Sequence, residues 1–178
     1  MSSTTFEPTI AARRATVSEH VRCENAHDLN GIMDTFGATA RYDDEPWHDR
    51  RLGRDDVQTY YQELLRSVPD LHIDVQREHV TGDSIILEVV IRGTHQGRWR
   101  GLPGTGRKVV IPLCGIFTFD EENRLAGEKI FYDRATVLRQ LGVFREPQSL
   151  FGGLTTALNH PVTIARAVLR GLTKAGVR

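Results

Sequence analysis

The sequence has few cysteines, no long apolar run and no net charge. Its 178 residues include two cysteines, Cys23 and Cys114, without a CxxC motif or a Cys/His cluster, so we expect neither a disulfide framework nor a zinc finger. The 23 lysines and arginines balance the 23 aspartates and glutamates, which argues against a general nucleic-acid binder. No stretch reaches the length of a membrane span, and the first residues lack the apolar core of a signal peptide. We therefore expect a cytoplasmic protein with neither nucleic acid nor a membrane as its partner.

Acidic residues are missing from the last part of the chain. None follows Glu146, which leaves 19 lysines and arginines against 23 acidic residues in 1–146. The bases after that point are Arg166, Arg170, Lys174 and Arg178. The segment from Pro161 is also amphipathic, so we predict a main domain at 1–146 and a basic, partly helical extension at 147–178. The extension can pack on the body or on a second subunit, or lie on an anionic membrane, and its short length favours packing.

Apolar periodicity predicts helices first and strands later. The predicted helices cover residues 8–25, 29–36, 55–68 and 134–141, and the predicted strands cover 38–43, 71–80, 84–95, 108–119 and 125–133. Residues 44–51 are polar, contain a proline and are predicted to form a loop. This order is typical of an α+β fold with helices on one face of an antiparallel sheet. The runs IILEVVI and VVIPLCGIF are apolar at successive positions, so a second subunit is expected to cover the other face in a homodimer.

Four segments resemble the SnoaL-like polyketide cyclases. Residues 93–109 (GTHQGRWRGLPGTGRKV) are similar to that family's "GTH-x-G … G-x-P-P-T-G-[RK]" passage, and residues 124–143 (RLAGEKIFYDRATVLRQLGV) are similar to its closing strand and helix. GRDDVQTYY and VPDLHIDV match in kind and order. The resemblance covers about residues 10–143. It implies a cone-shaped, curved antiparallel sheet wrapped by the N-terminal helices around one pocket, as in nuclear-transport-factor-2-like proteins.

The resemblance also implies a reaction and a base. Cyclases of this family close a ring by intramolecular aldol condensation without cofactor or metal, and the match places the proton-abstracting carboxylate on Asp133. Asp133 ends a strand and shares a face with Phe131, so an inward Phe131 would give Asp133 an apolar setting that raises its pKa. An aspartate directly before a helix is also a preferred N-cap, accepting a bond from the amide of Ala135 or Thr136. Both interpretations stay open.

His95 is the second candidate catalytic residue. It shares strand parity with residues 87, 89 and 91, and a neutral imidazole at the pocket could polarise a carbonyl or relay a proton. Hydrogen bonding into the adjoining glycine-rich loop is the favoured alternative. The family's cyclases place another histidine on the strand before the last, whereas this sequence has Cys114 and no histidine there.

The remaining candidates are predicted ligand contacts. They are Tyr42, Trp47, Trp99, Cys114 and Phe131. Core packing is the alternative for Tyr42 and Cys114, a surface turn for Trp47, and packing at the dimer interface for Trp99. The acidic run at 43–49 has no recognised ligand spacing, so we predict no metal site there. The family resemblance implies that no cofactor is needed.

Two functions follow from these observations. The first is an enzyme that performs acid–base chemistry next to a carbonyl on a small apolar ligand, as a polyketide cyclase or a ketosteroid-type isomerase does. The alternative is a non-catalytic domain that binds an apolar, carbonyl-containing small molecule. The histidine missing from the strand before the last supports the alternative.

Overall fold

The computed structural model describes residues 6–175, which form two compact units divided between Leu141 and Gly142. The helices of the first unit are α1 (Phe6–Ala26), α2 (Leu29–Thr35), α3 (Arg54–Ser67) and α4 (Arg134–Gln140), with a short 3-10 helix η1 (Glu45–Trp47). Its strands are β1 (Arg41–Asp44), β2 (Asp49–Leu52), β3 (His72–Val80), β4 (Ser84–Thr94), β5 (Lys108–Phe119) and β6 (Leu125–Tyr132). The second unit contains α5 (Leu150–Asn159) and α6 (Pro161–Ala175). The predicted boundary after Glu146 lies in the connection between α4 and α5.

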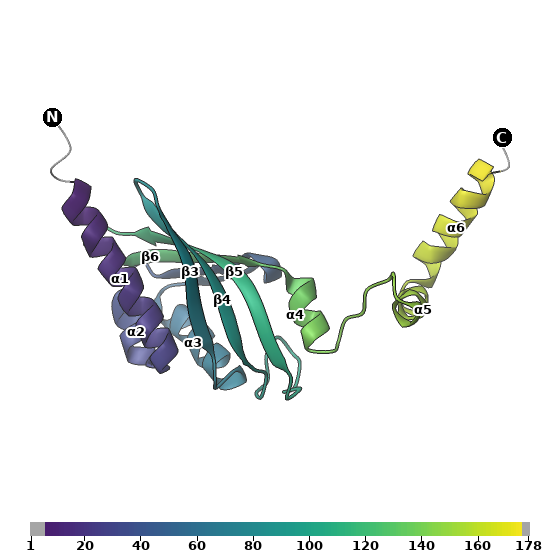
Figure 1. The fold of residues 1–178 in the computed structure, drawn as a ribbon, viewed down its shortest axis with the longest axis horizontal. Coiled ribbons are helices and arrows are strands. Elements are labelled where there is room, and N and C mark those ends of the chain that lie inside the picture. The colour runs from purple at the N-terminus through teal and green to yellow at the C-terminus, as the bar shows by residue number, and fades with distance from the viewer. Residues whose placement is uncertain (1–5, 176–178) are drawn as a thin grey trace. The chain divides into compact units, whose positions relative to one another are not determined.

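A six-stranded, curved and unclosed sheet forms the centre of the first unit. The strand order is β2-β1-β6-β5-β4-β3, and α1, α2 and α3 lie along one face of the sheet (Figure 1). The long strands β3 to β6 pair antiparallel in chain order, as predicted. The β1 strand pairs in parallel with β6, which the sequence had not indicated. The predicted α+β cone is therefore confirmed, with one parallel pair added.

The prediction of a loop at 44–51 is wrong. This segment holds η1 and β2, and β2 pairs antiparallel with β1 from Asp44↔Asp49 to Arg41↔Leu52. Pro46 lies in the first turn of η1, and His48 then takes a left-handed backbone with φ 52°, which reverses the chain. A polar sequence can form this hairpin because β2 lies at the edge of the sheet.

The hydrophobic core lies between the helices and the inner face of the sheet. On β4 the inward residues Ile85, Leu87 and Val89 are 1%, 4% and 6% exposed. The opposite face is less covered, because Val110 and Phe131 are each more than 40% exposed there. One face of the sheet is thus buried within the chain and the other is not, and cover of that second face by another subunit stays a prediction.

Candidate active site

Two small cavities lie inside the first unit, which we call the cone. The first has a volume of about 30 Å³ and is lined mainly by apolar side chains of the sheet. The second has a volume of about 50 Å³ and lies beside α4. Because Leu64, Leu71 and Ile91 line both, the two cavities adjoin. Each has room for only a few water molecules, so a larger ligand must displace side chains.

The first cavity has a polar end formed by two carboxylates. Glu24 from α1 and Glu128 from β6 line it, and they are only 7% and 5% exposed. His20 lies one turn before Glu24 on α1 and is fully buried, with its Nε2 3.3 Å from Glu128 Oε2 and 3.8 Å from Glu24 Oε1. A charged group this deeply buried is rare unless it is paired, and here three ionisable side chains pair with one another.

The hydrogen bonds define the protonation of His20. Thr35 donates its hydroxyl hydrogen to the Ile32 carbonyl, so Nδ1 of His20, 2.7 Å from that hydroxyl, must donate. Tyr61 donates to Glu128 at 2.7 Å, so Nε2 of His20, 3.0 Å from the Tyr61 hydroxyl, must donate as well. Both ring nitrogens carry hydrogen, and His20 is an imidazolium.

The pKa values of this cluster agree with that assignment. Burial acts to lower the pKa of His20, but the charges of Glu24 and Glu128 outweigh it, and the pKa is raised. Burial raises the pKa of Glu24 to about 7, against the opposing effect of His20. A carboxyl group with this pKa can both accept and donate a proton at neutral pH, which is what general acid–base catalysis requires.

The same cluster is the place where a metal ion could be held. Ligand atoms of His20, Glu24 and Glu128 all lie within 4.8 Å of one another. A metal would need the lone pair of a His20 nitrogen, and in the observed network both nitrogens donate hydrogen bonds. The arrangement fits bound protons better than a bound metal.

His95 lies in the wall of the second cavity and is 2% exposed. The backbone N–H of Thr105 donates to His95 Nδ1 at 3.3 Å, so the ring hydrogen of the neutral form is on Nε2. Burial lowers the pKa of His95, which favours that neutral form. Among the described residues Nε2 has no hydrogen-bond partner. A buried N–H donor beside an apolar cavity is suited to an acceptor oxygen of a ligand.

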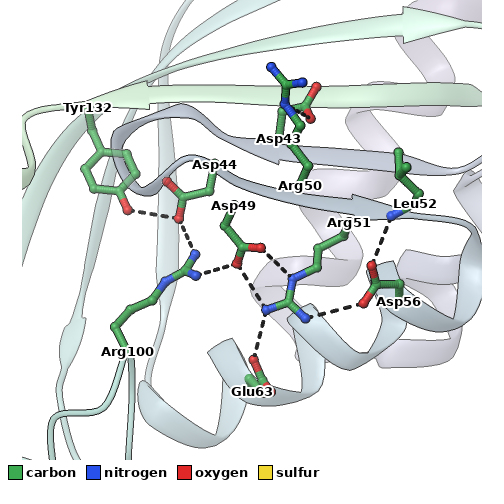
Figure 2. Close-up of polar contacts among 10 residues, drawn as sticks. All are labelled: Asp43, Asp44, Asp49, Arg50, Arg51, Leu52, Asp56, Glu63, Arg100 and Tyr132. Atoms are coloured by element: carbon green, nitrogen blue, oxygen red, sulfur yellow. Dashed lines mark hydrogen bonds and ion pairs between the residues drawn. The ribbon is translucent and has the colours of Figure 1, made fainter.

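Trp99 separates the second cavity from an open groove at the rim of the cone. Its side chain lines both spaces, and the groove has a volume of about 410 Å³. Trp99 lies in the loop that connects β4 to β5. The next residue, Arg100, holds this loop in place by ion pairs to Asp44 and Asp49 (Figure 2). The Arg100 guanidinium also lies over the rings of Trp47 and Trp99, at 5.5 and 5.7 Å from their centres. The loop therefore closes the interior from the rim.

The charged groups around Arg100 form a connected network. Asp44 is fully buried and accepts hydrogen bonds from Arg100 at 2.6 Å and from the Tyr132 hydroxyl at 3.2 Å. Arg51 links Asp49 to acidic residues of α3 (Figure 2). Burial raises the pKa of Asp44, while Arg100 opposes that effect. Since these groups hold one another, the network positions the loop rather than offering a free base.

The expectation that Asp133 faces a dry pocket is wrong. Its side chain is 61% exposed and caps α4, accepting a hydrogen bond from the Ala135 amide at 2.9 Å. The Thr136 hydroxyl also donates to this carboxylate and is the main cause that lowers the pKa of Asp133. A solvated carboxylate with a lowered pKa is a weak base at neutral pH.

Phe131 and Cys114 also lie outside the cavities, which corrects their expected place in the pocket. They are paired neighbours on β6 and β5, and Phe131 is 43% exposed. Glu128 and Ile130 of the same strand line the first cavity, and because side chains alternate along a strand, the face that carries Phe131 is the outer one. Asp133 shares the direction of Phe131, which is why it too points away from the interior.

The other predicted ligand contacts lie inside or at the rim. Tyr42 is 4% exposed and lines the first cavity, with its ring centre 4.2 Å from that of Tyr60. Trp47 is half-buried and meets Trp99 edge to face, with ring centres 5.3 Å apart. These positions allow ligand contact, and the binding roles stay predictions.

The sequence did contain a signal for the residues that were missed. On α1, Val17 and Val21 mark the buried side, and His20 and Glu24 continue it at spacings of three and four residues. A histidine and a glutamate on an apolar stripe indicate a buried polar pair. Glu128 gave no such signal, because its strand could face either way.

Comparison with known proteins agrees with this fold. The family model of the SnoaL-like polyketide cyclases matches residues 14–141. No curated protein matches the sequence.

Several solved structures share the fold. A SnoaL-like protein from Jannaschia sp. CCS1 is 19% identical, with 76% of this chain and 94% of that chain covered and a TM-score of 0.68. AclR from Streptomyces galilaeus, a candidate hydroxylase, is 24% identical over 76% of this chain and 88% of its own, with a TM-score of 0.66. IdmH from Streptomyces antibioticus, a candidate polyketide cyclase, is 24% identical over 74% of this chain and 99% of its own, with a TM-score of 0.62. At these identities the likeness concerns the fold, and it is the family match over residues 14–141 that shows the chain to be a member of the SnoaL-like polyketide cyclase family.

Proposed function

We propose that the protein is a small-molecule enzyme that performs acid–base chemistry next to a carbonyl, of the polyketide-cyclase or ketosteroid-isomerase type. The observation that carries the proposal is Glu24, a buried carboxyl with a pKa of about 7 in the wall of a mainly apolar cavity. Family membership supports the same class of reaction. The apolar lining favours a substrate that is mostly hydrocarbon.

In this proposal Glu24 removes a proton from the carbon next to a substrate carbonyl. The resulting enolate attacks a second carbonyl of the same molecule in a cyclase, or is protonated at another carbon in an isomerase. The proton on Glu24 then returns to the new alkoxide or to that carbon, so the reaction consumes no oxidant and no cofactor. The imidazolium of His20 offsets the charge of Glu128, which lets Glu24 alternate between its two forms.

His95 has a supporting role in the proposal. Its Nε2–H can donate to the substrate carbonyl oxygen and stabilise the negative charge that develops there. Trp99 and Tyr42 then contact the apolar part of the substrate, because they line the two cavities. Trp99 must also move aside for access from the rim groove.

The outer face of the sheet supports a homodimer as part of this proposal. Val110 and Phe131 are 42% and 43% exposed there. Apolar residues on a sheet face tend to be covered in the functional assembly. A second copy offers the same face, which suits a two-fold interface.

Exchange of the carbonyl-adjacent protons of a bicyclic ketone, 2-tetralone, tests the base. In D2O the protein is expected to accelerate exchange, measured by NMR, and Glu24→Gln should lower the rate by about 100-fold or more. Asp133→Asn is the matched variant, because asparagine also caps a helix, and it should leave the rate nearly unchanged.

The contrary results are equally clear. If Asp133→Asn abolishes the exchange and Glu24→Gln retains it, the catalytic base is Asp133, as the family resemblance implies, and not Glu24. Saturable 2-tetralone binding without any acceleration of exchange would support the non-catalytic binding domain. Circular dichroism of each variant shows whether a lost rate reflects lost folding.

A further inference from the structure

The second unit carries the most exposed apolar side chains of the described chain. In α5 and α6 these side chains are 56% to 94% exposed, and they are Leu150, Phe151, Leu154, Leu158, Val162, Val168 and Leu169. In the described part of the cone, Leu52 is the large apolar side chain that is more than half exposed. A concentration of this kind marks a surface that contacts something apolar.

The apolar residues form a stripe on each helix. In α5 they recur at Leu150, Leu154 and Leu158, one turn apart, and residues 150–159 contain no charged side chain. In α6 Ile164, Val168 and Leu169 share one side. Arg166 and Arg170 are four residues apart, on the other side. The two helices are therefore amphipathic, and the polar side of α6 is basic.

The charged residues of α5 and α6 are all basic. No acidic residue follows Glu146, whereas Arg166, Arg170, Lys174 and Arg178 do. An apolar stripe beside a basic side is the pattern of helices that lie in the interface of an anionic bilayer. Within residues 6–175, no helix combines the length and the apolar character needed to cross a bilayer. The pattern thus fits contact with the surface of a membrane.

An acidic protein surface fits the same unit less well. Such a surface pairs with the bases, but exposed ion pairs contribute little to binding. It offers no cover for α5, which has apolar residues and no charge. A bilayer with anionic headgroups offers an apolar layer directly beneath a layer of negative charge.

We propose that α5 and α6 bind the surface of an anionic lipid bilayer and hold the cone beside it. The apolar stripes of both helices insert at the boundary of headgroups and acyl chains, while the basic side of α6 meets anionic headgroups. The proposal does not depend on the reaction in the cone. It gives a function to the part of the chain that lies beyond the family match.

Vesicle flotation of the full chain tests the proposal. The protein should float with vesicles of phosphatidylcholine and phosphatidylserine, and only weakly with phosphatidylcholine alone. Leu154→Asp with Leu169→Asp should weaken binding at least about tenfold, because two charges replace inserted apolar groups. Arg166→Gln with Arg170→Gln should weaken it about fivefold for each charge removed, and salt should weaken it further.

Matched variants in the cone control for general effects. Leu52→Asp and Arg77→Gln change residues of the same kinds that are 65% and 66% exposed in the cone, and both should float like the unchanged protein. Equal flotation with both kinds of vesicle, or no flotation, overturns the proposal. So does binding that survives Leu154→Asp with Leu169→Asp. Light scattering that shows a dimer lost in this double variant, without vesicle binding, would assign the apolar stripes to a second copy of the chain.

Discussion

The cone and the C-terminal unit use the same apolar residue types in opposite ways. In the cone, Phe36, Ile32 and Leu125 are fully buried, because a sheet and three helices close around them. In the C-terminal unit, Leu150 is 94% and Leu158 71% exposed. A unit of this size made of two helices has too little volume to enclose a core. The difference indicates that most of the folding stability and the buried ionisable groups belong to the cone, whereas the second unit presents its apolar side chains on its surface.

The largest effect is expected from His20→Ala in the cone. The change removes the imidazolium that pairs with Glu128 and Glu24 and leaves Thr35 without its donor, so it should lower the free energy of unfolding by about 3–5 kcal/mol. Urea denaturation followed by circular dichroism measures it. His160→Ala, at an exposed position of the second unit, is the control and should change little. An equal loss of unfolding free energy in both variants would contradict the statement that the cone holds most of the folding stability.

A smaller effect on the free energy of unfolding is expected from a change in pH, and Glu24 determines whether stability rises or falls with pH. Its pKa is raised from 4.5 to about 7 in the folded protein, so the folded state binds more protons than the unfolded state between these values. The stability gained from this group is present below pH 4.5 and is lost as the pH rises towards 7. His20, whose pKa is also raised above 6.5, loses its contribution in the same direction.

Urea denaturation across this pH range measures the slope. The free energy of unfolding should fall by on the order of 2 kcal/mol, and Glu24→Gln should flatten the fall. A slope that is unchanged in Glu24→Gln would mean that Glu24 titrates normally and cannot serve as the base. Because the second unit has no acidic residue after Glu146, changes there should leave the slope intact.

The smallest effect is expected from Asp133, at the start of α4. Asp133→Ala removes a helix cap and should lower stability several-fold less than His20→Ala, while Asp133→Asn should keep most of the cap. Because the pKa of Asp133 is lowered, its contribution is present at neutral pH and is lost as the pH falls through the folded pKa. Urea denaturation at neutral and acidic pH checks both statements. A loss as large as that of His20→Ala would show that the exposed carboxylate has a role beyond capping.

The sequence was sufficient for most of the elements. The apolar stripe of α3, with Val57, Tyr60 and Tyr61, is buried as its helical spacing predicts. Turns with glycine, proline or aspartate ended the strands where they were expected, since local backbone preferences act over a few residues. The β1–β6 parallel pair was not predictable, because it depends on how distant segments meet.

The sequence by itself determined the α+β class, the family resemblance and a basic amphipathic end, because these depend on spacing and composition. Tertiary structure alone decided which face of β6 is inside, since strand alternation places Phe131 and Glu128 on opposite faces without showing which of them meets the core. That one choice left Asp133 in solvent and brought Glu128 to His20 and Glu24. The chemistry of a carboxylate depends on its surroundings, and those surroundings come from three elements that are far apart in the chain.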